Sequence, residues 1–98
     1  MDVSLPEVEL AAIEVVLDGY RARGLGFHAL RTRQAGSRAF VTLHVLVPGA
    51  WTVQVGHDWC ESIEADIRLA LPRVHVTTHL EPMEDPLSLV DQDLDRAD

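Results

Sequence analysis

The sequence predicts a small α+β domain in which two helices cover one face of a three-stranded sheet. Its 98 residues are enough for one domain with a modest hydrophobic core. Apolar residues recur with helical spacing in two segments and with strand-like alternation in three, in the order helix, strand, strand, helix, strand. Elements in this order favour two packed layers, with both helices on the same side of the sheet.

A first helix is expected over residues 5–22. The preceding Ser-Leu-Pro-Glu segment at 4–7 has the pattern of a capping box, with proline early in the first turn. Gly24 and Gly26 end the helix. The apolar residues that share one face of this helix are Leu10, Ile13, Val16, Leu17 and Tyr20.

Two strands are expected at 27–34 and 38–47, joined by a turn at 35–37. If Gln34 and Arg38 close that turn, His28 and His44 lie directly opposite each other on one face of the hairpin. Strict alternation along the first strand would place Arg31 and Arg33 on the face opposite to His28, and a longer loop would shift the register.

A second helix is expected over 53–70, followed by a third strand over 74–80. Trp51 precedes Thr52, a suitable N-cap residue, and Pro72 stops the helix. The third strand returns through this helical crossover, which allows parallel pairing, but the sequence does not fix the strand order. Because the strand at 38–47 is partly apolar on both faces, a homodimer is the simplest way to cover the second face.

The net charge of −8 is concentrated at the C-terminal end of the chain. Residues 81–98 carry seven acids and one arginine, so residues 83–98 are predicted to form an acidic, disordered tail. A basic face for nucleic acid is not expected, whereas a cation is the easier ligand. The chain has no apolar run of about 20 residues and no signal peptide, so it is expected to be soluble. Its single Cys60 fits a reducing compartment and is interpreted as a buried structural thiol.

Several residues of metal-ligand type are spread over the predicted elements: His28, His44, His57, His79 and Glu81. Imidazole and carboxylate are ligands that suit zinc and similar divalent cations. His79 and Glu81 leave the same face of one strand, whereas His75, about 13 Å before His79, is interpreted as a surface residue. A lone histidine is more often a surface residue than a ligand, and no HExxH or CxxC spacing is present. From the residues alone, a metal site and unrelated histidines are about equally supported.

Catalysis is not expected from the sequence. No serine or cysteine nucleophile has an evident base and orienting partner, and there is no glycine-rich phosphate loop. We therefore expect a binding protein rather than an enzyme.

Several segments over residues 1–82 together resemble the cytoplasmic C-terminal domain of the cation diffusion facilitator family. The members of this family are zinc and divalent-cation efflux transporters. The most specific stretch is His-Ala-Leu-Arg-Thr-Arg-Gln-Ala-Gly at 28–36. Leu-His-Val at 43–45, Val-Gly-His at 55–57 and His-Leu-Glu-Pro at 79–82 complete the pattern. Two positions depart from it: Ala29 stands where many members have aspartate, and Gly56 stands where alanine is common.

The resemblance implies an αββαβ metallochaperone-like (ferredoxin-like) fold that forms a V-shaped homodimer. It also implies zinc near the dimer interface, regulation of transport, and attachment to a transmembrane domain at the cytoplasmic side of the membrane. By position, His28, His44, His57 and His79 match the family's ligands, and Glu81 falls where some members have a bridging aspartate. Cobalt, nickel, cadmium and manganese remain alternatives to zinc. A stand-alone metal-binding module and a purely structural dimerisation domain are the alternative functions.

Overall fold

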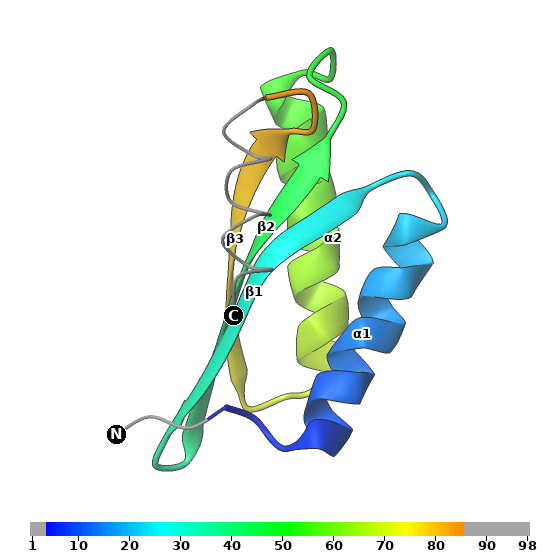
Figure 1. Ribbon diagram of the computed structural model, residues 1–98. Coiled ribbons are helices and arrows are strands. Elements are labelled where there is room, and N and C mark those ends of the chain that lie inside the picture. The colour runs from blue at the N-terminus through cyan, green and yellow to red at the C-terminus, as the bar shows by residue number, and fades with distance from the viewer. Residues whose placement is uncertain (1–3, 86–98) are drawn as a thin grey trace.

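The computed structural model describes residues 4–85, which form two helices packed on a three-stranded sheet (Figure 1). In chain order the elements are α1 (Glu7–Arg21), β1 (Gly26–Ala35), β2 (Arg38–Val47), α2 (Val53–Ala70) and β3 (Val74–Pro82). The predicted αββαβ order and α+β class are confirmed. The larger part of the predicted acidic tail, residues 86–98, lies outside the described residues.

The start of α1 differs from the predicted capping box. Pro6 is the N-cap residue and no side chain caps the helix. Instead, the Pro6 carbonyl accepts hydrogen bonds from the Glu9 and Leu10 amides, and the Leu5 amide donates to Thr32 Oγ1 at 3.2 Å. Leu5 is buried in the core. The entry into the helix is therefore fixed by contacts with β1 and the core rather than by the serine.

The bounds of α2 agree with the prediction. Thr52 is the N-cap, and its Oγ1 accepts a hydrogen bond from the Val55 amide at 3.1 Å. Trp51 packs back onto the helix, with its ring centroid 5.8 Å from that of Trp59. This stacking holds the chain at the point where it leaves β2 and enters α2.

The sheet has the strand order β1-β2-β3, with β1 antiparallel and β3 parallel to β2, a parallel pairing that the helical crossover allows. Both helices lie on one side of the sheet, so β2 buries alternate residues beneath them (Figure 1). We call the other side the open face. The fully buried large side chains all belong to the helix-covered side: Ile13, Leu17, Val41, Leu43, Val45, Ile63 and Ile67.

The hairpin between β1 and β2 contains a β-bulge that the sequence did not predict. Ala35 pairs with Arg38, so the turn is the two residues at 36–37, and closure by Gln34 and Arg38 was wrong. The register then shifts between Arg31 and His28, where Ala29 has a φ of +55°. This extra residue restores the predicted pairing of His28 with His44.

The bulge also changes the face on which the following β1 residues lie. Arg31 pairs with Thr42 and Arg33 pairs with Phe40, and paired residues project to the same side of a sheet. Thr42 and Phe40 alternate with the core residues of β2, so they lie on the open face together with His44. The prediction that Arg31 and Arg33 lie opposite to His28 was therefore wrong, because strict alternation fails at a bulge.

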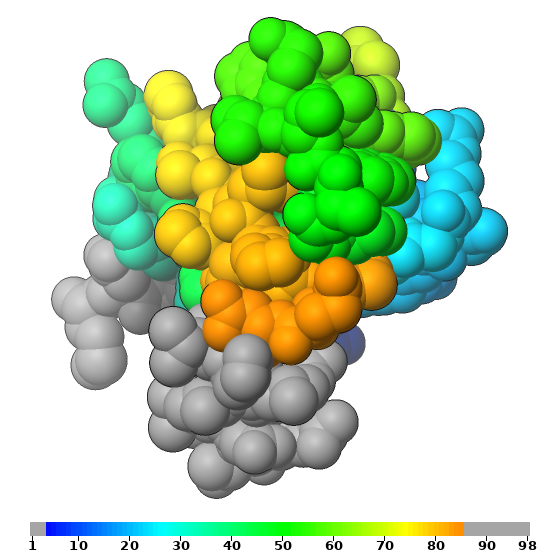
Figure 2. Space-filling view, turned by 90° about the horizontal axis from the view of Figure 1, so that it is seen from above, coloured from blue at the N-terminus to red at the C-terminus, as the bar shows by residue number. Residues whose placement is uncertain are grey.

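The end of β3 extends two residues beyond the predicted strand and joins the loop that follows β2. The Met83 amide donates to the Val47 carbonyl at 2.9 Å, and the Glu84 carboxylate accepts from the Gly49 amide at 3.0 Å. Figure 2 shows this end of the molecule from above, with the end of β3 beside the loop after β2. These contacts hold Glu81 inside the strand rather than in a loop.

Candidate metal site

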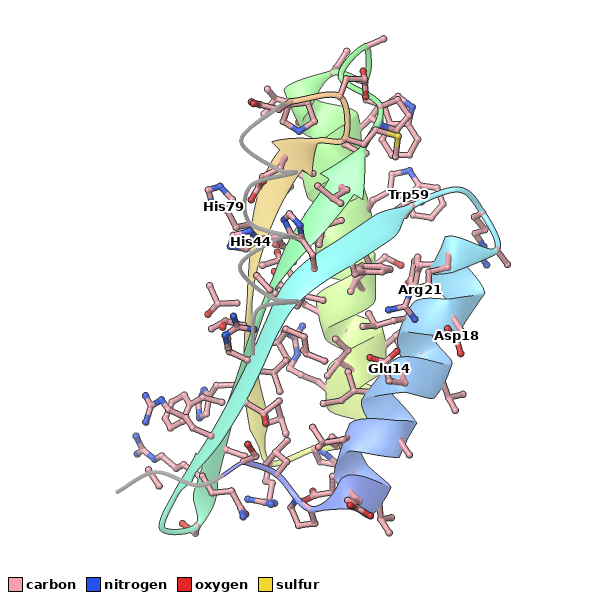
Figure 3. The ribbon with its side chains drawn as sticks, viewed as in Figure 1. Glu14, Asp18, Arg21, His44, Trp59 and His79 are labelled. Atoms are coloured by element: carbon pink, nitrogen blue, oxygen red, sulfur yellow. The ribbon has the colours of Figure 1, made fainter. Side chains whose placement is uncertain are left out.

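Three neighbouring strands bring four of the five predicted ligands to one end of the open face. His28 pairs with His44 across the β1–β2 ladder, and His44 pairs with His79 across the β2–β3 ladder. Glu81 lies two residues after His79 and shares its face. Figure 3 shows His44 and His79 on the side of the sheet away from the helices.

His28, His44 and Glu81 form the tightest part of this group. His44 Nδ1 lies 2.5 Å from Glu81 Oε2 and 3.2 Å from His28 Nε2, and His28 Nε2 lies 3.6 Å from Glu81 Oε1. One donor atom from each of the three residues falls within 4.8 Å of the others. This is a spacing that a single divalent cation could bridge, and two imidazoles with one carboxylate suit zinc.

The burial of His28 and Glu81 favours a defined site over a solvated cluster. His28 is only 7% exposed and Glu81 only 9% exposed, although neither helix covers this face. The His28 Nδ1 atom is buried without a hydrogen-bond partner. A buried carboxylate is costly unless charges or donors face it, so a bound cation would stabilise this arrangement.

His79 lies beside the three-residue group rather than within it. Its Nε2 is 3.7 Å from Glu81 Oε2, and its ring centroid is 5.0 Å from that of His44. Its side chain is 69% exposed. A rotation of this exposed side chain could bring it toward the same cation, as a further imidazole ligand.

His57 is not brought to this group within the chain. It lies near the start of α2, in the helix layer, and its side chain is mostly exposed. Its nearest charged partner is Glu61, one turn later on the same helix, with His57 Nε2 3.6 Å from Glu61 Oε1. The sequence placed His57 at the end of the domain where β2 exits, which is where α2 begins.

Two other side chains match their predicted roles. His75 is exposed at the other end of β3 and stacks on Phe40, with ring centroids 5.3 Å apart. Cys60 is a buried residue of α2, and desolvation raises the pKa of its thiol. A raised pKa disfavours the thiolate that metals and electrophiles require, which fits a structural thiol.

The face predicted for Arg31 and Arg33 was wrong because of the bulge. Arg31, Arg33 and Arg38 all lie on the same face as the histidines, at the end nearer the hairpin turn. The only indication in the sequence was that the hairpin contains three arginines. An alanine within a strand gives no indication of the positive φ that accompanies the bulge. Within residues 4–85, neither helix is both long and apolar enough to cross a membrane.

The chain matches known proteins along most of its length. Residues 5–83 match the sequence model of a family described as "Cation efflux protein, cytoplasmic domain". A Synechocystis protein described as an uncharacterized transporter is 56% identical over 88 residues, covering 90% of this chain and 28% of its own length. The cation-efflux pump FieF of Pectobacterium atrosepticum is 32% identical over 84 residues, covering 85% of this chain and 27% of its own.

Solved structures have the same fold. The Zn form of CzrB superposes with a TM-score of 0.72 at 38% sequence identity, covering 84% of this chain and 93% of that one. By contrast, this chain spans little more than a quarter of the length of the two relatives above, at 28% and 27%.

Proposed function

The chain belongs to the cation efflux protein family, as a cytoplasmic domain, and we propose that it senses divalent metal and regulates a cation efflux transporter. The observation that carries this proposal is the convergence of His28, His44 and Glu81, with donor atoms within 4.8 Å of one another. Zinc is the proposed metal because two imidazoles and a carboxylate suit it. The Zn form of the similar CzrB domain supports the same choice.

The proposed regulation works through a homodimer. His57 lies in the helix layer, away from the group on its own open face, so a zinc ion bound there would recruit His57 from a second protomer. Metal would then bind the closed pair of domains more tightly than the separated pair, and this difference in affinity would draw the domains together. In the full-length protein, that movement would act on the transmembrane domain at the cytoplasmic side of the membrane.

Zinc titration by isothermal calorimetry tests the proposal on the 98-residue chain. Saturable binding is expected in the parent. In the double variant His28→Ala/His44→Ala we expect an affinity loss of at least about 100-fold, since even outer-shell partners are worth about 10–100-fold. His75→Ala is the matched control, because this exposed histidine lies on the same face outside the group.

Sedimentation with and without zinc separates the proposal from its alternatives. Metal-dependent association that His57→Ala removes would support the regulatory dimer. Zinc binding that leaves association unchanged would favour a metal-binding module without this regulation. If the parent binds no zinc, the metal-sensing proposal fails and a purely structural dimerisation domain remains.

A further inference from the structure

Helix α2 is rich in acidic side chains, and one of them differs from the others in its contacts. The helix carries four acids and one arginine, so its surface favours cations over anions. Three of the acids accept hydrogen bonds from polar side chains: Asp58 from Gln54, Glu64 from Thr78, and Asp66 from Tyr20. The fourth is Glu61, whose hydrogen-bond or ion-pair partner among residues 4–85 is His57 alone.

The spacing of His57 and Glu61 is that of two donors on one metal ion. They lie one helical turn apart, at i and i+4, where side chains are neighbours on the helix surface. His57 Nε2 is 3.6 Å from Glu61 Oε1, which is too long for a hydrogen bond. Two ligand atoms at about 2.0–2.2 Å from a tetrahedral zinc ion lie about 3.3–3.5 Å apart. The pair therefore needs only a small adjustment to hold a cation.

Both side chains of this pair are accessible to an ion from solvent. The His57 side chain is 60% exposed and the Glu61 side chain is 59% exposed. An imidazole and a carboxylate attract each other as an ion pair only when the imidazole is protonated, whereas a neutral imidazole and a carboxylate both offer lone pairs to a cation. Water completes the coordination of zinc where the protein supplies fewer than four ligands.

We propose that His57 and Glu61 form a second cation site, on α2, which takes a divalent transition-metal ion such as zinc. With two protein donors, the site holds the ion weakly within one protomer. In the closed dimer of the proposed function, an ion shared between the protomers would receive two donors from α2 rather than one, and the Glu61 carboxylate would offset part of its charge. That second step rests on the proposed function, whereas the site on α2 does not.

Zinc titration followed by NMR through the ring signals of His57 tests the site on the 98-residue chain. A His44→Ala/His79→Ala background weakens the open-face group without opening the core, because neither side chain is fully buried. In this background the His57 signals, identified by their loss in His57→Ala, should shift and saturate with zinc. Backbone amide spectra check that each variant is folded.

Two further variants in this background separate ligation from charge. Glu61→Gln should weaken zinc binding by about tenfold or more, as for loss of a group that supports a metal. Asp58→Asn is the matched control: it removes the same charge beside His57, but its carboxylate is bonded to Gln54, so it should change the affinity by about twofold or less. Equal weakening in both variants, or His57 signals that do not respond to zinc, would overturn the proposal.

Replacing the carboxylate by another ligand gives a rescue. Glu61→His loses the same charge as Glu61→Gln but places a second imidazole at i+4, the spacing of the two histidines in HExxH, so zinc binding should be at least as tight as in the background. Weakening equal to that of Glu61→Gln would show that position 61 acts through charge alone and would overturn the proposal.

Sedimentation with zinc, in the chain that keeps its open-face histidines, tests the second step. Glu61→Gln should weaken zinc-dependent association. Association that His57→Ala removes but Glu61→Gln leaves unchanged would overturn the sharing of Glu61 and leave the proposed function intact. Zinc binding on α2 without any zinc-dependent association would contradict the proposed function and support the α2 site on its own.

Discussion

One face of the sheet contributes mainly to stability, and the other carries the side chains suited to binding. On the helix-covered face of β2, Val41, Leu43 and Val45 are at most 1% exposed and pack in the core. On the open face of the same strand, Thr42 and His44 alternate with them and face the arginines and the ligand group. Neighbouring residues of one strand therefore serve different purposes. Substitutions on one face should affect unfolding, and substitutions on the other should affect binding.

The largest expected effect comes from a pair of neighbours on opposite faces. Leu43→Ala leaves a cavity in the core and should lower the free energy of unfolding by about 2–5 kcal/mol. Thr42→Ala, on the exposed side, should cost less than about 1 kcal/mol, within the range of strand preference. Urea denaturation of both variants measures the difference. Equal costs would mean that the open face is packed as tightly as the core.

A smaller effect, on binding rather than unfolding, is expected at His79. We expect His79→Ala to weaken zinc binding by about 10–100-fold, or about 1.4–2.7 kcal/mol, because its ring lies next to the His44–Glu81 pair. The melting temperature without metal should change little, since the side chain is mostly exposed. Thr77→Ala, two residues earlier on the same face, is the control for calorimetry. Unchanged affinity in His79→Ala would restrict the site to three ligands.

Gly56 tests how closely the helix layer approaches the sheet. A Cβ atom at this position would come within 2.5 Å of a terminal methyl of Leu80 on β3. Overpacking costs about 1–3 kcal/mol, and alanine regains up to about 1 kcal/mol of helix propensity. We therefore expect Gly56→Ala to destabilise the fold by about 1 kcal/mol net, measured by thermal unfolding. A more stable variant would show that the Leu80 side chain can adopt another rotamer at little cost.

The smallest effect is expected at the Tyr20 hydroxyl in the helix layer. It hydrogen-bonds to Ser62 and Asp66, and desolvation together with the Asp66 bond raises its pKa above the usual 10.0. The folded state thus retains the proton more firmly than the unfolded state. The hydroxyl's contribution to the free energy of unfolding is therefore complete below pH 10.0 and is lost as the pH rises further.

Tyr20→Phe should therefore cost about 1 kcal/mol or less near neutral pH and flatten the decline of stability above about pH 10. Chemical denaturation across that pH range checks the slope. A parallel decline in parent and variant would contradict the role assigned to this hydroxyl.

Most of the fold followed from local pattern, whereas the site depended on geometry that local pattern does not encode. Alternation in β2 and the Thr52 cap predicted their elements within two residues. The opposition of His28 and His44 was also predicted, but through two displacements that cancel: a shorter turn and a bulge at Ala29. No residue in that segment favours a positive φ, so the bulge and the face of Arg31 could not be foreseen.

The position of β3 shows a second limit of prediction from sequence. Its pairing with β2 places His79 beside His44 and Glu81 within reach of both histidines. Strand order arises from how the whole chain packs, and a single strand carries no signal for its neighbour. The sequence therefore paired His28 with His44 and His79 with Glu81, but it could not state that the two pairs meet, or that His57 lies apart from them in the same chain.

The stacked tryptophans have an optical consequence. The chain contains two tryptophans, Trp51 and Trp59, and their rings lie 5.8 Å apart in the first half of the helix layer. Native fluorescence therefore originates from one spot, next to the turn of α2 that carries His57. Trp51 also lines a pocket together with Glu81 of the ligand group, so emission should respond to a cation bound at that group. The two tryptophans thus give the domain an intrinsic optical probe of metal binding that needs no added label.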